Sequence, residues 1–382
     1  MADVEPLTPR RLDASSFLVP GSGPYLLTHS VGCLPRSSRA ALDAHFLRPW
    51  AELGGNAWPV WLRHVEAFRA ALANLFGGAP PEYCPQANLS SGLAKLLLAL
   101  PRAPAAKSTL LAAEDSFPSL GFVLRQAERS GHSLRLLPRT DSPDALRTWS
   151  DALTDDVRVA LVTHVFSNTG RVAPVAQIAK LCAERDILCV VDVAQSAGIL
   201  PVDVSELGAD AVLGSCIKWL CGGPGAGWLW IRHELIAALE PVDVGWFSHA
   251  DPFEMDIHHF EYATDALRFW GGTPSIAPFV LATAGLGLIH ELGVEKIRAH
   301  NRRLIQAFTD ALSRAWRARL PAWPTGGTLC IPLGTEFDAV TTRLKNAGAQ
   351  FDTRGDVIRV SFHACNTDED ATRVALAWRE DR

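Results

Sequence analysis

The chain has 382 residues, of which 48% are hydrophobic and 20% charged, and its formal net charge is −5. This length suits two domains, and the composition supplies enough apolar side chains for a buried core. A net negative charge without a long run of Lys or Arg argues against a nucleic-acid-binding surface. The N-terminal stretch has no apolar run long enough for a signal peptide or a membrane span, so we expect no membrane partner.

Eight cysteines and twelve histidines are scattered along the chain. They form no CxxC pair and no HExxH spacing. In a chain of this size that distribution is typical of buried thiols in a reducing compartment, and not of a disulfide framework or a zinc site. The sequence therefore predicts a cytoplasmic protein with no bound metal.

In chain order, the predicted elements begin after an irregular stretch rich in Gly and Pro. Helical patterns follow at residues 37–53, 60–78 and 90–101; the second ends on Gly-Gly and the third is stopped by Pro101. From residue 108 to 231, fully apolar runs such as RVALVTHV and ILCVVDVA alternate with helical patterns. Apolar strands separated by helices predict a mainly parallel, doubly wound α/β sheet covered on both faces.

The pattern changes near residue 275. Long helices with a 3.6-residue period follow, and then a small strand–helix–strand–helix unit built around GTLCIPL and DVIRVSF. We therefore expect residues 1–40 to form an N-terminal segment that contributes to the small domain or an interface. Residues 41–275 would form the large domain and residues 276–382 the small C-terminal domain.

Two residues concentrate the chemistry of the sequence. Asp192 closes an apolar strand at the edge where α/β sheets bind ligands, and an ionised carboxylate there needs a cationic partner. Lys218 follows the next apolar strand, between Ile217 and Trp219, where poor hydration lowers the pKa of its amine and suits it to Schiff-base chemistry. Each residue alone also fits a purely structural role. Asp192 fits a helix cap, and Lys218 fits a lysine whose amine extends to solvent.

Together, Asp192 and Lys218 form the arrangement that pyridoxal 5′-phosphate (PLP) requires. The acid would pair with the protonated pyridine nitrogen, and the lysine would bind the aldehyde. The GGPGAG run that follows Lys218 is superficially like a dinucleotide loop, but no strand–GxGxxG–helix unit surrounds it. We interpret it as a segment of close backbone packing near the cofactor.

The blocks DVAQSAG, GSCIKWLCGGPGAG, GWFSH and WGGTPSI resemble those of kynureninases, in the class V aminotransferase group with cysteine desulfurases, C–S lyases and isopenicillin-N-epimerase-like enzymes. The resemblance runs from about residue 26 to residue 359. It implies fold type I, with a doubly wound large domain and a smaller C-terminal α/β domain. It also implies a homodimer that shares its active sites.

For the phosphate group of the cofactor, the resemblance implies four ligands. Ser90 and Ser91, in NLSSGL, would form the phosphate loop at a helix N-terminus. Ser215 matches the phosphate-binding serine of many relatives. Thr273, in WGGTPSI, would reach the phosphate across the dimer interface.

For the ring and the substrate, the resemblance implies that Phe117 stacks on the pyridine, which agrees with the fit of a flat apolar face to a flat heterocycle. Gln195 would hydrogen-bond the phenolic oxygen, with help from Asn168. Arg359 would bind the α-carboxylate of the substrate with its two-pronged guanidinium. A Trp-rich surround that includes Trp246 favours a bulky substrate.

The departures from kynureninases concern the substrate. Ile217 stands where they carry a tyrosine, Gln195 where they carry a histidine, and PSL follows Phe117 where they place an acid. We therefore expect a PLP-dependent lyase that cleaves a C–S or C–C bond at Cβ of an L-amino acid, with natural-product biosynthesis as its expected setting. The alternatives are a kynureninase, a decarboxylating deaminase, an epimerase, an aminotransferase, or a non-catalytic binding protein with the same fold.

Overall fold

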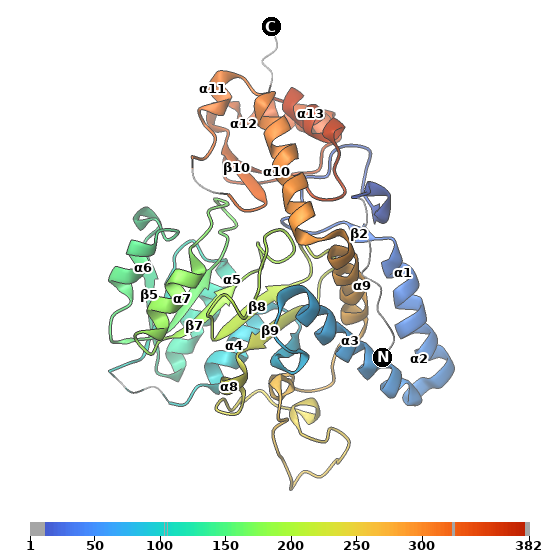
Figure 1. Cartoon of the computed structure of the whole chain (residues 1–382), viewed down its shortest axis with the longest axis vertical. Helices are drawn as coiled ribbons and strands as arrows, with labels where there is room; N and C mark the ends of the chain where they lie inside the picture. Colours follow the sequence, from blue (N-terminus) through green and yellow to red (C-terminus); the bar gives the residue numbers. More distant parts are fainter. Residues whose placement is uncertain (1–11, 103, 105, 323–324, 379–382) are drawn as a thin grey trace.

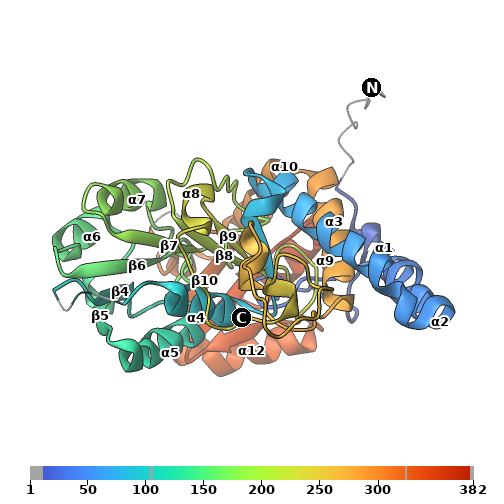
Figure 2. The ribbon, with the colours of Figure 1, turned by 90° about the horizontal axis from the view of Figure 1, so that it is seen from below.

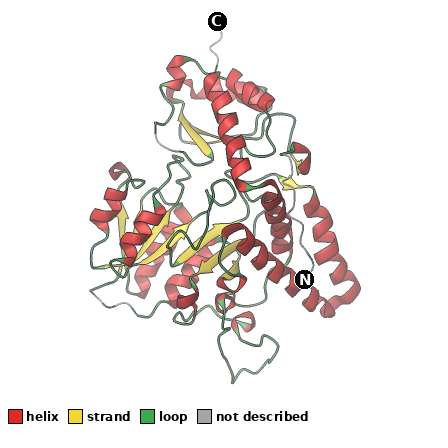
Figure 3. Ribbon diagram, in the orientation of Figure 1, coloured by secondary structure: helices red, strands yellow, loops and turns green. Residues whose placement is uncertain are grey.

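The computed structural model describes residues 12–102, 104, 106–322 and 325–378, so residues 1–11 of the expected N-terminal segment lie outside the described residues. A large α/β body carries a smaller C-terminal body at one end, and helices α1 (Ser37–Leu42) and α2 (Arg48–Leu53) extend along one side (Figure 1). Coloured by secondary structure, the strands of the large body form one layer between helices (Figure 3).

The large body contains a seven-stranded sheet in the order β3-β9-β8-β7-β6-β4-β5. Strands β8, β7, β6, β4 and β5 are mutually parallel, whereas β9 runs antiparallel to both β3 and β8. The mainly parallel α/β sheet is therefore confirmed. The strands are Tyr83–Gln86 (β3), Thr109–Ala113 (β4), Ser133–Leu137 (β5), Val157–Thr163 (β6), Leu188–Asp192 (β7), Ala211–Ser215 (β8) and Gly227–Ile231 (β9).

Two features of this sheet differ from the pattern in the sequence. Strand β3 is short and contains Pro85, which obscures its strand signal, and it lies at the edge where proline is tolerated. Strand β9 turns back against β8 because the connection between them is too short for the helical crossover that a parallel pair needs.

Helices cover both faces of the sheet. Seen from below, α6 and α7 lie on one face, and α4 and α5 lie on the other (Figure 2). Strands β4 and β9 are consequently buried along their whole length, which explains their unbroken apolar sequences. These helices are Leu89–Ala99 (α4), Pro118–Gln126 (α5), Leu146–Ala152 (α6) and Val175–Ala183 (α7); a short helix, His233–Ile236 (α8), follows β9.

The N-terminal helices pack beside α9. Helix α3 contacts α9 closely, and the buried side chains of α9 belong to the core of the large body. Within the described residues, no single helix is long and apolar enough to cross a membrane; α9 and α10 reach that apolar length only together and are bent by 76°. The bounds are Ser37–Leu42 (α1), Arg48–Leu53 (α2), Trp58–Phe76 (α3), Ala277–Leu292 (α9) and Val294–Asp310 (α10).

The small body has its own core. A three-stranded antiparallel sheet, in the order β10-β12-β11, packs with helices around buried side chains such as Phe308 and Phe362. Leu26 from the N-terminal segment joins this core. The domain bounds expected from the sequence stay a prediction. The elements are Arg314–Arg317 (α11), Thr328–Pro332 (β10), Phe337–Asn346 (α12), Asp352–Arg354 (β11), Val357–Ser361 (β12) and Asp368–Leu376 (α13); a separate ribbon pairs Phe17–Leu18 (β1) with Leu34–Pro35 (β2).

Candidate active site

A cavity of about 340 Å³ lies at the carboxyl ends of the central strands. Thr163 ends β6, Asp192 ends β7 and Ser215 ends β8, and all three line the cavity. This is the edge at which open α/β sheets bind ligands. The cavity brings together these residues expected from the sequence: Ser90, Phe117, Asp192, Gln195, Ser215, Lys218 and Arg359.

Lys218 carries an unpartnered amine in this cavity. No hydrogen bond or ion pair to its Nζ is formed by any residue in the described part of the chain. Burial lowers the pKa of Lys218 to about 8; Asp192 opposes the shift, while the positive charges of Arg359 and Arg354 add to it. A larger fraction of the amine is therefore unprotonated near neutral pH than in an exposed lysine, which favours a role as a nucleophile or proton acceptor.

Asp192 is a buried carboxylate, 5% exposed. Its Oδ1 accepts a hydrogen bond of 2.8 Å from the backbone N–H of Ala194. Burial raises the pKa of Asp192, whereas the positive charge of Lys218 and the Ala194 hydrogen bond act to lower it. A cationic group placed against this carboxylate would therefore be bound strongly, because it would restore the favoured ionised form.

The ring of Phe117 offers a flat surface inside the cavity. The side chain is 40% exposed. The Nζ of Lys218 lies 5.5 Å from the ring centroid and the Cζ of Arg354 lies 5.9 Å from it. Cations near an aromatic face are favourable, and the same face suits a planar heterocycle.

The N-terminus of helix α4 forms one end of the cavity. Asn88 caps this helix, and its Oδ1 accepts hydrogen bonds from the Oγ of Ser90 at 2.7 Å and the N–H of Ser91 at 2.9 Å. Gly227 keeps β9 close, because a Cβ there would lie 2.9 Å from the Cα of Asn88. A helix N-terminus flanked by hydroxyls is suited to an anion such as a phosphate.

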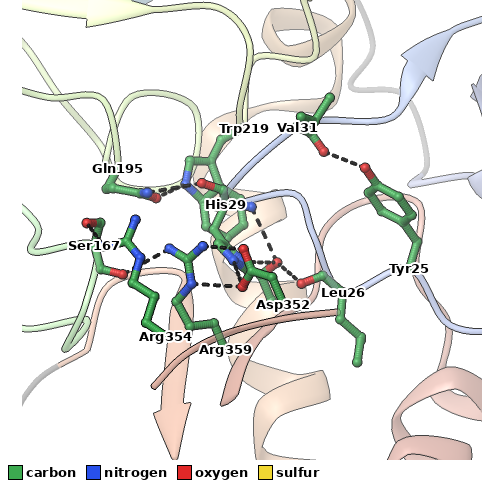
Figure 4. Close-up of polar contacts among 11 residues, drawn as sticks. Tyr25, Leu26, His29, Val31, Ser167, Gln195, Trp219, Asp352, Arg354 and Arg359 are labelled. Atoms are coloured by element: carbon green, nitrogen blue, oxygen red, sulfur yellow. Dashed lines mark hydrogen bonds and ion pairs between the residues drawn. The ribbon is translucent and has the colours of Figure 1, made fainter. Parts of the chain in front are cut away.

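Gln195 is held from two sides. Its Nε2 donates to the carbonyl of His29 at 3.0 Å, and its Oε1 accepts from the indole N–H of Trp219 at 3.3 Å. One amide N–H of Gln195 therefore remains for a ligand. Its side chain lies beside the arginine network of the small body (Figure 4).

Arg359 lies at the other end of the cavity and is almost completely buried. Its Nε donates to Asp352 Oδ1 at 2.8 Å, its Nη2 pairs with Asp352 Oδ2, and its Nη1 donates to the carbonyl of Ser167 at 3.1 Å (Figure 4). These bonds use three of the five N–H donors of the guanidinium, which leaves two for a carboxylate.

His29 completes the support of this arginine. Its Nδ1 lies 2.9 Å from the Oγ of Ser361 and its Nε2 lies 3.0 Å from Asp352 Oδ1. Burial lowers the pKa of His29 to about 4, against the raising effect of the Asp352 hydrogen bond, so the imidazole is neutral at neutral pH. Burial alone would raise the pKa of Asp352, but hydrogen bonds from His29 and Arg359 hold it well below its usual range.

Arg354 is a cavity residue that the sequence did not reveal. Its Nη1 donates to Ser167 Oγ at 2.7 Å, and its guanidinium lies beside that of Arg359 (Figure 4). Strands β11 and β12 form a hairpin in which Asp352 lies opposite Arg359 and Arg354 lies opposite Val357. The segment TRGDV, with Gly355 at φ 59°, carries the signal of a two-residue turn that would have given this register.

Four residues expected in the site do not line this cavity among the described residues. Ser91 bonds Asn88 only through its backbone, and Asn168 donates to Asp115 Oδ1 at 2.9 Å while its own Oδ1 has no partner. Trp246 and Thr273 lie elsewhere and bond each other, from indole Nε1 to Oγ1, at 3.2 Å. Their expected roles therefore stay predictions.

Comparison with known proteins identifies the family. The aminotransferase class-V family model matches residues 64–374. A kynureninase of Deinococcus radiodurans is 31% identical over 313 residues, which cover 80% of this chain and 74% of that protein. The uncharacterized aminotransferase YcbU of Bacillus subtilis is 28% identical over 320 residues, or 83% of each chain.

Solved structures share the fold at low sequence identity. The cystine C–S lyase C-DES, in complex with its reaction product cysteine persulfide, has a TM-score of 0.82 and 22% identity; the match covers 92% of this chain and 96% of that one. The cysteine desulfurase CsdA of Escherichia coli has a TM-score of 0.80 and 19% identity, with 95% and 96% covered.

The chain belongs to the class V aminotransferase family, with fold type I, and its cofactor is PLP. The donors in the cavity fit this cofactor. They comprise an unpartnered amine, a buried carboxylate, a flat aromatic face and a capped helix N-terminus. When bound, PLP withdraws electrons from Cα of an amino acid and stabilises negative charge there.

Proposed function

We propose that this protein is a PLP-dependent lyase that eliminates a sulfur substituent from Cβ of an L-amino acid. In this reaction Lys218 removes the proton from Cα, and a thiolate leaves Cβ with the electron pair of the C–S bond. With one water, the substrate gives pyruvate, ammonia and a thiol. If the substituent is a disulfide, the released product is a persulfide.

One observation carries this choice: Lys218 is the one described side chain lining the cavity that has a free, weakly basic nitrogen. Both ring nitrogens of His29 have partners, and the guanidinium groups of Arg354 and Arg359 offer hydrogen-bond donors but no acceptor. Elimination of a thiolate needs a proton shuttle at Cα and a leaving group of low basicity. Hydrolytic cleavage of a ketone side chain needs a second group to activate water, and among the described residues that line the cavity none is left for this role once Asp192 pairs with the cofactor.

The cavity wall also supports a substrate other than kynurenine. Ile217 and Gln195, two of the positions at which the sequence departs from kynureninases, both line the cavity, and so does Ser119 in the PSL segment. None of these side chains carries an acid or a base that titrates near neutral pH. The fold shared with the C–S lyase C-DES adds support for cleavage at sulfur.

For the cofactor, we propose that Lys218 binds the aldehyde and that Asp192 pairs with the pyridine nitrogen. Phe117 would stack on the ring, and Gln195 with Asn168 would hold the phenolic oxygen. The α4 N-terminus with Ser90 and Ser91, and Ser215 from β8, would bind the phosphate. The substrate α-carboxylate would bind Arg359.

We also propose a homodimer, in which Thr273 reaches the phosphate of the partner's cofactor and Trp246 contributes to the substrate surround. Light scattering of the parent protein and of the Thr273→Val variant, both loaded with cofactor, tests this proposal. A dimer whose cofactor affinity falls in the variant is expected. A fully active monomer would contradict it.

Product analysis tests the reaction type. Purified enzyme is incubated separately with L-cystine, S-alkyl-L-cysteines and L-kynurenine, and the release of pyruvate, ammonia, carbon dioxide, alanine and anthranilate is measured. Pyruvate and ammonia in equal amounts, without carbon dioxide, are expected from a sulfur substrate. Efficient release of anthranilate and alanine would instead establish a kynureninase, and stoichiometric carbon dioxide a decarboxylating enzyme.

A further inference from the structure

An irregular loop between His249 and Tyr262 lies at the end of the molecule opposite the small body (Figure 1). Its two ends are joined by a bridge between His249 and Tyr262, and by a hydrogen bond of 2.9 Å from the N–H of Ala250 to the carbonyl of Glu261. Phe253, at 49%, and Ile257, at 93%, are exposed, so the loop has little apolar core of its own.

Three side chains converge within this loop. His249 lies at the base of the loop, Glu254 lies near its tip, and His259 lies on the segment that returns from the tip to the base. Glu254 Oε2 lies 2.8 Å from His249 Nε2, and Glu254 Oε1 lies 2.6 Å from His259 Nδ1. The ligand atoms of all three lie within 4.8 Å of one another. In the sequence the three are spaced too widely to form a recognised motif, which is why no metal site was expected.

His249 is oriented by the backbone. Its side chain is 9% exposed, and its Nδ1 lies 2.7 Å from the carbonyl oxygen of Glu261. The ring also stacks on Phe260, with centroids 5.5 Å apart and planes inclined by 27°. The backbone N–H of Glu261 also lies 3.0 Å from Nδ1. In the tautomer in which Nδ1–H donates to that carbonyl, Nε2 carries no proton, and its lone pair is available to a metal ion placed between it and Glu254. A hydrogen bond on the far nitrogen fixes metal-binding histidines in proteins in the same way.

The dimensions suit a small ion. Zinc bonds of about 2.0–2.1 Å in tetrahedral geometry place neighbouring ligand atoms roughly 3.4 Å apart. The three side chains need only small movements to reach this spacing, and His259 at 48% and Glu254 at 33% side-chain exposure are free to make them. The exposed side leaves room for water as a further ligand.

We propose that His249, Glu254 and His259 bind one divalent transition-metal ion, for which zinc is the best match. Two imidazoles and one carboxylate are donors that zinc accepts, whereas Mg²⁺ and Ca²⁺ prefer sites made of oxygen alone. None of the three residues lines the cavity of its own chain, so the ion would not belong to the cofactor site formed there.

The ion would fix the loop by linking its base, its tip and the segment that returns from the tip to the base. The loop follows directly from the Trp246–Ser248 turn, whose Trp246 is bonded to Thr273. Metal binding would therefore hold the exposed side chains of the loop, among them Phe253 and Met255, in one arrangement beside that turn. Proteolysis within the loop reports this ordering directly.

The test uses untagged, cofactor-loaded enzyme freed of metal with a chelator. Zinc binding is measured by calorimetry, with Mg²⁺ as a comparison, and loop cleavage by chymotrypsin is followed with and without zinc. We expect one zinc ion per chain, no binding of Mg²⁺, and slower cleavage when zinc is present. His259→Ala and Glu254→Gln should weaken zinc binding by at least about tenfold.

His258→Ala is the matched control, because the neighbouring exposed histidine is outside the cluster. It should keep both the zinc affinity and the protection from cleavage. Absence of zinc binding to the parent enzyme would overturn the proposal and leave an ion-paired His–Glu–His cluster. Equal zinc affinity in His259→Ala and His258→Ala would also overturn it.

Discussion

The two walls of the cavity are built in different ways. The cofactor wall comes from the large sheet, where Asp192 and Lys218 follow adjacent strands and are coupled electrostatically. The substrate wall comes from the small body, where Arg359 is supported by Asp352 and His29. The first wall gives Asp192 one backbone hydrogen bond and leaves the amine of Lys218 without a hydrogen-bond partner among the described residues, whereas the second holds its arginine in a nearly complete network.

The difference indicates two kinds of preorganisation. Burial without a hydrogen-bond partner changes the proton affinity of Lys218, which suits a group that exchanges protons. Bidentate pairing fixes the orientation of Arg359, which suits a group that binds a carboxylate and takes no part in the chemistry. Substitutions in the first wall should therefore affect kcat most, and substitutions in the second should affect KM.

The largest expected effect is that of Lys218→Ala. Loss of the proton shuttle alone costs about 10²–10⁴-fold in rate, and loss of the covalent attachment adds to it, so kcat should fall by at least about 10³-fold. Steady-state kinetics and the visible spectrum of the purified protein measure this. Lys345→Ala removes an exposed lysine and should leave both unchanged. Wild-type turnover in Lys218→Ala would be incompatible with the proposed mechanism.

The second prediction compares the two arginines. Truncating one side of a desolvated charge pair costs about 2–5 kcal/mol, so Arg359→Ala should lower kcat/KM by roughly 30-fold or more. Arg354→Ala should act less strongly, because within the described part of the chain its guanidinium has one hydrogen bond, to Ser167, and the residue is only partly buried. The cofactor spectrum should stay intact in both variants. A larger loss for Arg354→Ala would assign the carboxylate to Arg354.

The third prediction concerns the support of Arg359. The folded pKa of His29 is about 4, against about 6.5 when unfolded. The unfolded chain therefore binds a proton that the folded chain does not, and stability falls as the pH drops from 6.5 to 4. Urea unfolding measures the free energy of unfolding at pH 7 and at pH 5. This free energy should decrease between pH 7 and pH 5, and the decrease should be about 1–2 kcal/mol smaller in His29→Asn than in the parent. His258→Asn should behave like the parent, and an unchanged pH dependence in His29→Asn would contradict the assignment.

The smallest expected effect is a shift in the pH at which Lys218 is half-reactive toward an amine-selective reagent, and it involves no loss of activity. In the cofactor-free enzyme, the pKa of Lys218 is lowered to about 8 by burial. Its reaction with an amine-selective reagent, followed by peptide mass spectrometry, should therefore rise with pH around a midpoint near 8. Lys345, which is exposed, is the internal reference. A common midpoint for both lysines would remove the basis for a specially tuned amine.

Much of the cofactor wall could be predicted from the sequence, because strand ends are visible as the last residues of apolar runs. Asp192 and Lys218 follow from this rule, Ser215 was implied by the family resemblance, and the structure places all three around one cavity. The substrate wall depends on contacts between distant segments. His29 meets Asp352 across 323 positions of the chain, and no local pattern marks such a pair. Arg354 was missed although its hairpin turn has a recognisable sequence.

Borohydride reduction of the purified, cofactor-loaded enzyme, followed by peptide mapping, tests the assignment of Lys218 most directly. Reduction makes the bond between the cofactor and its lysine permanent, so the modified residue can be identified among the six lysines that the sequence contains at positions 95, 107, 180, 218, 296 and 345. We predict loss of the visible absorption band together with a pyridoxyl group on Lys218 alone. A label on any other lysine, or loss of the band without a label on Lys218, would contradict this assignment.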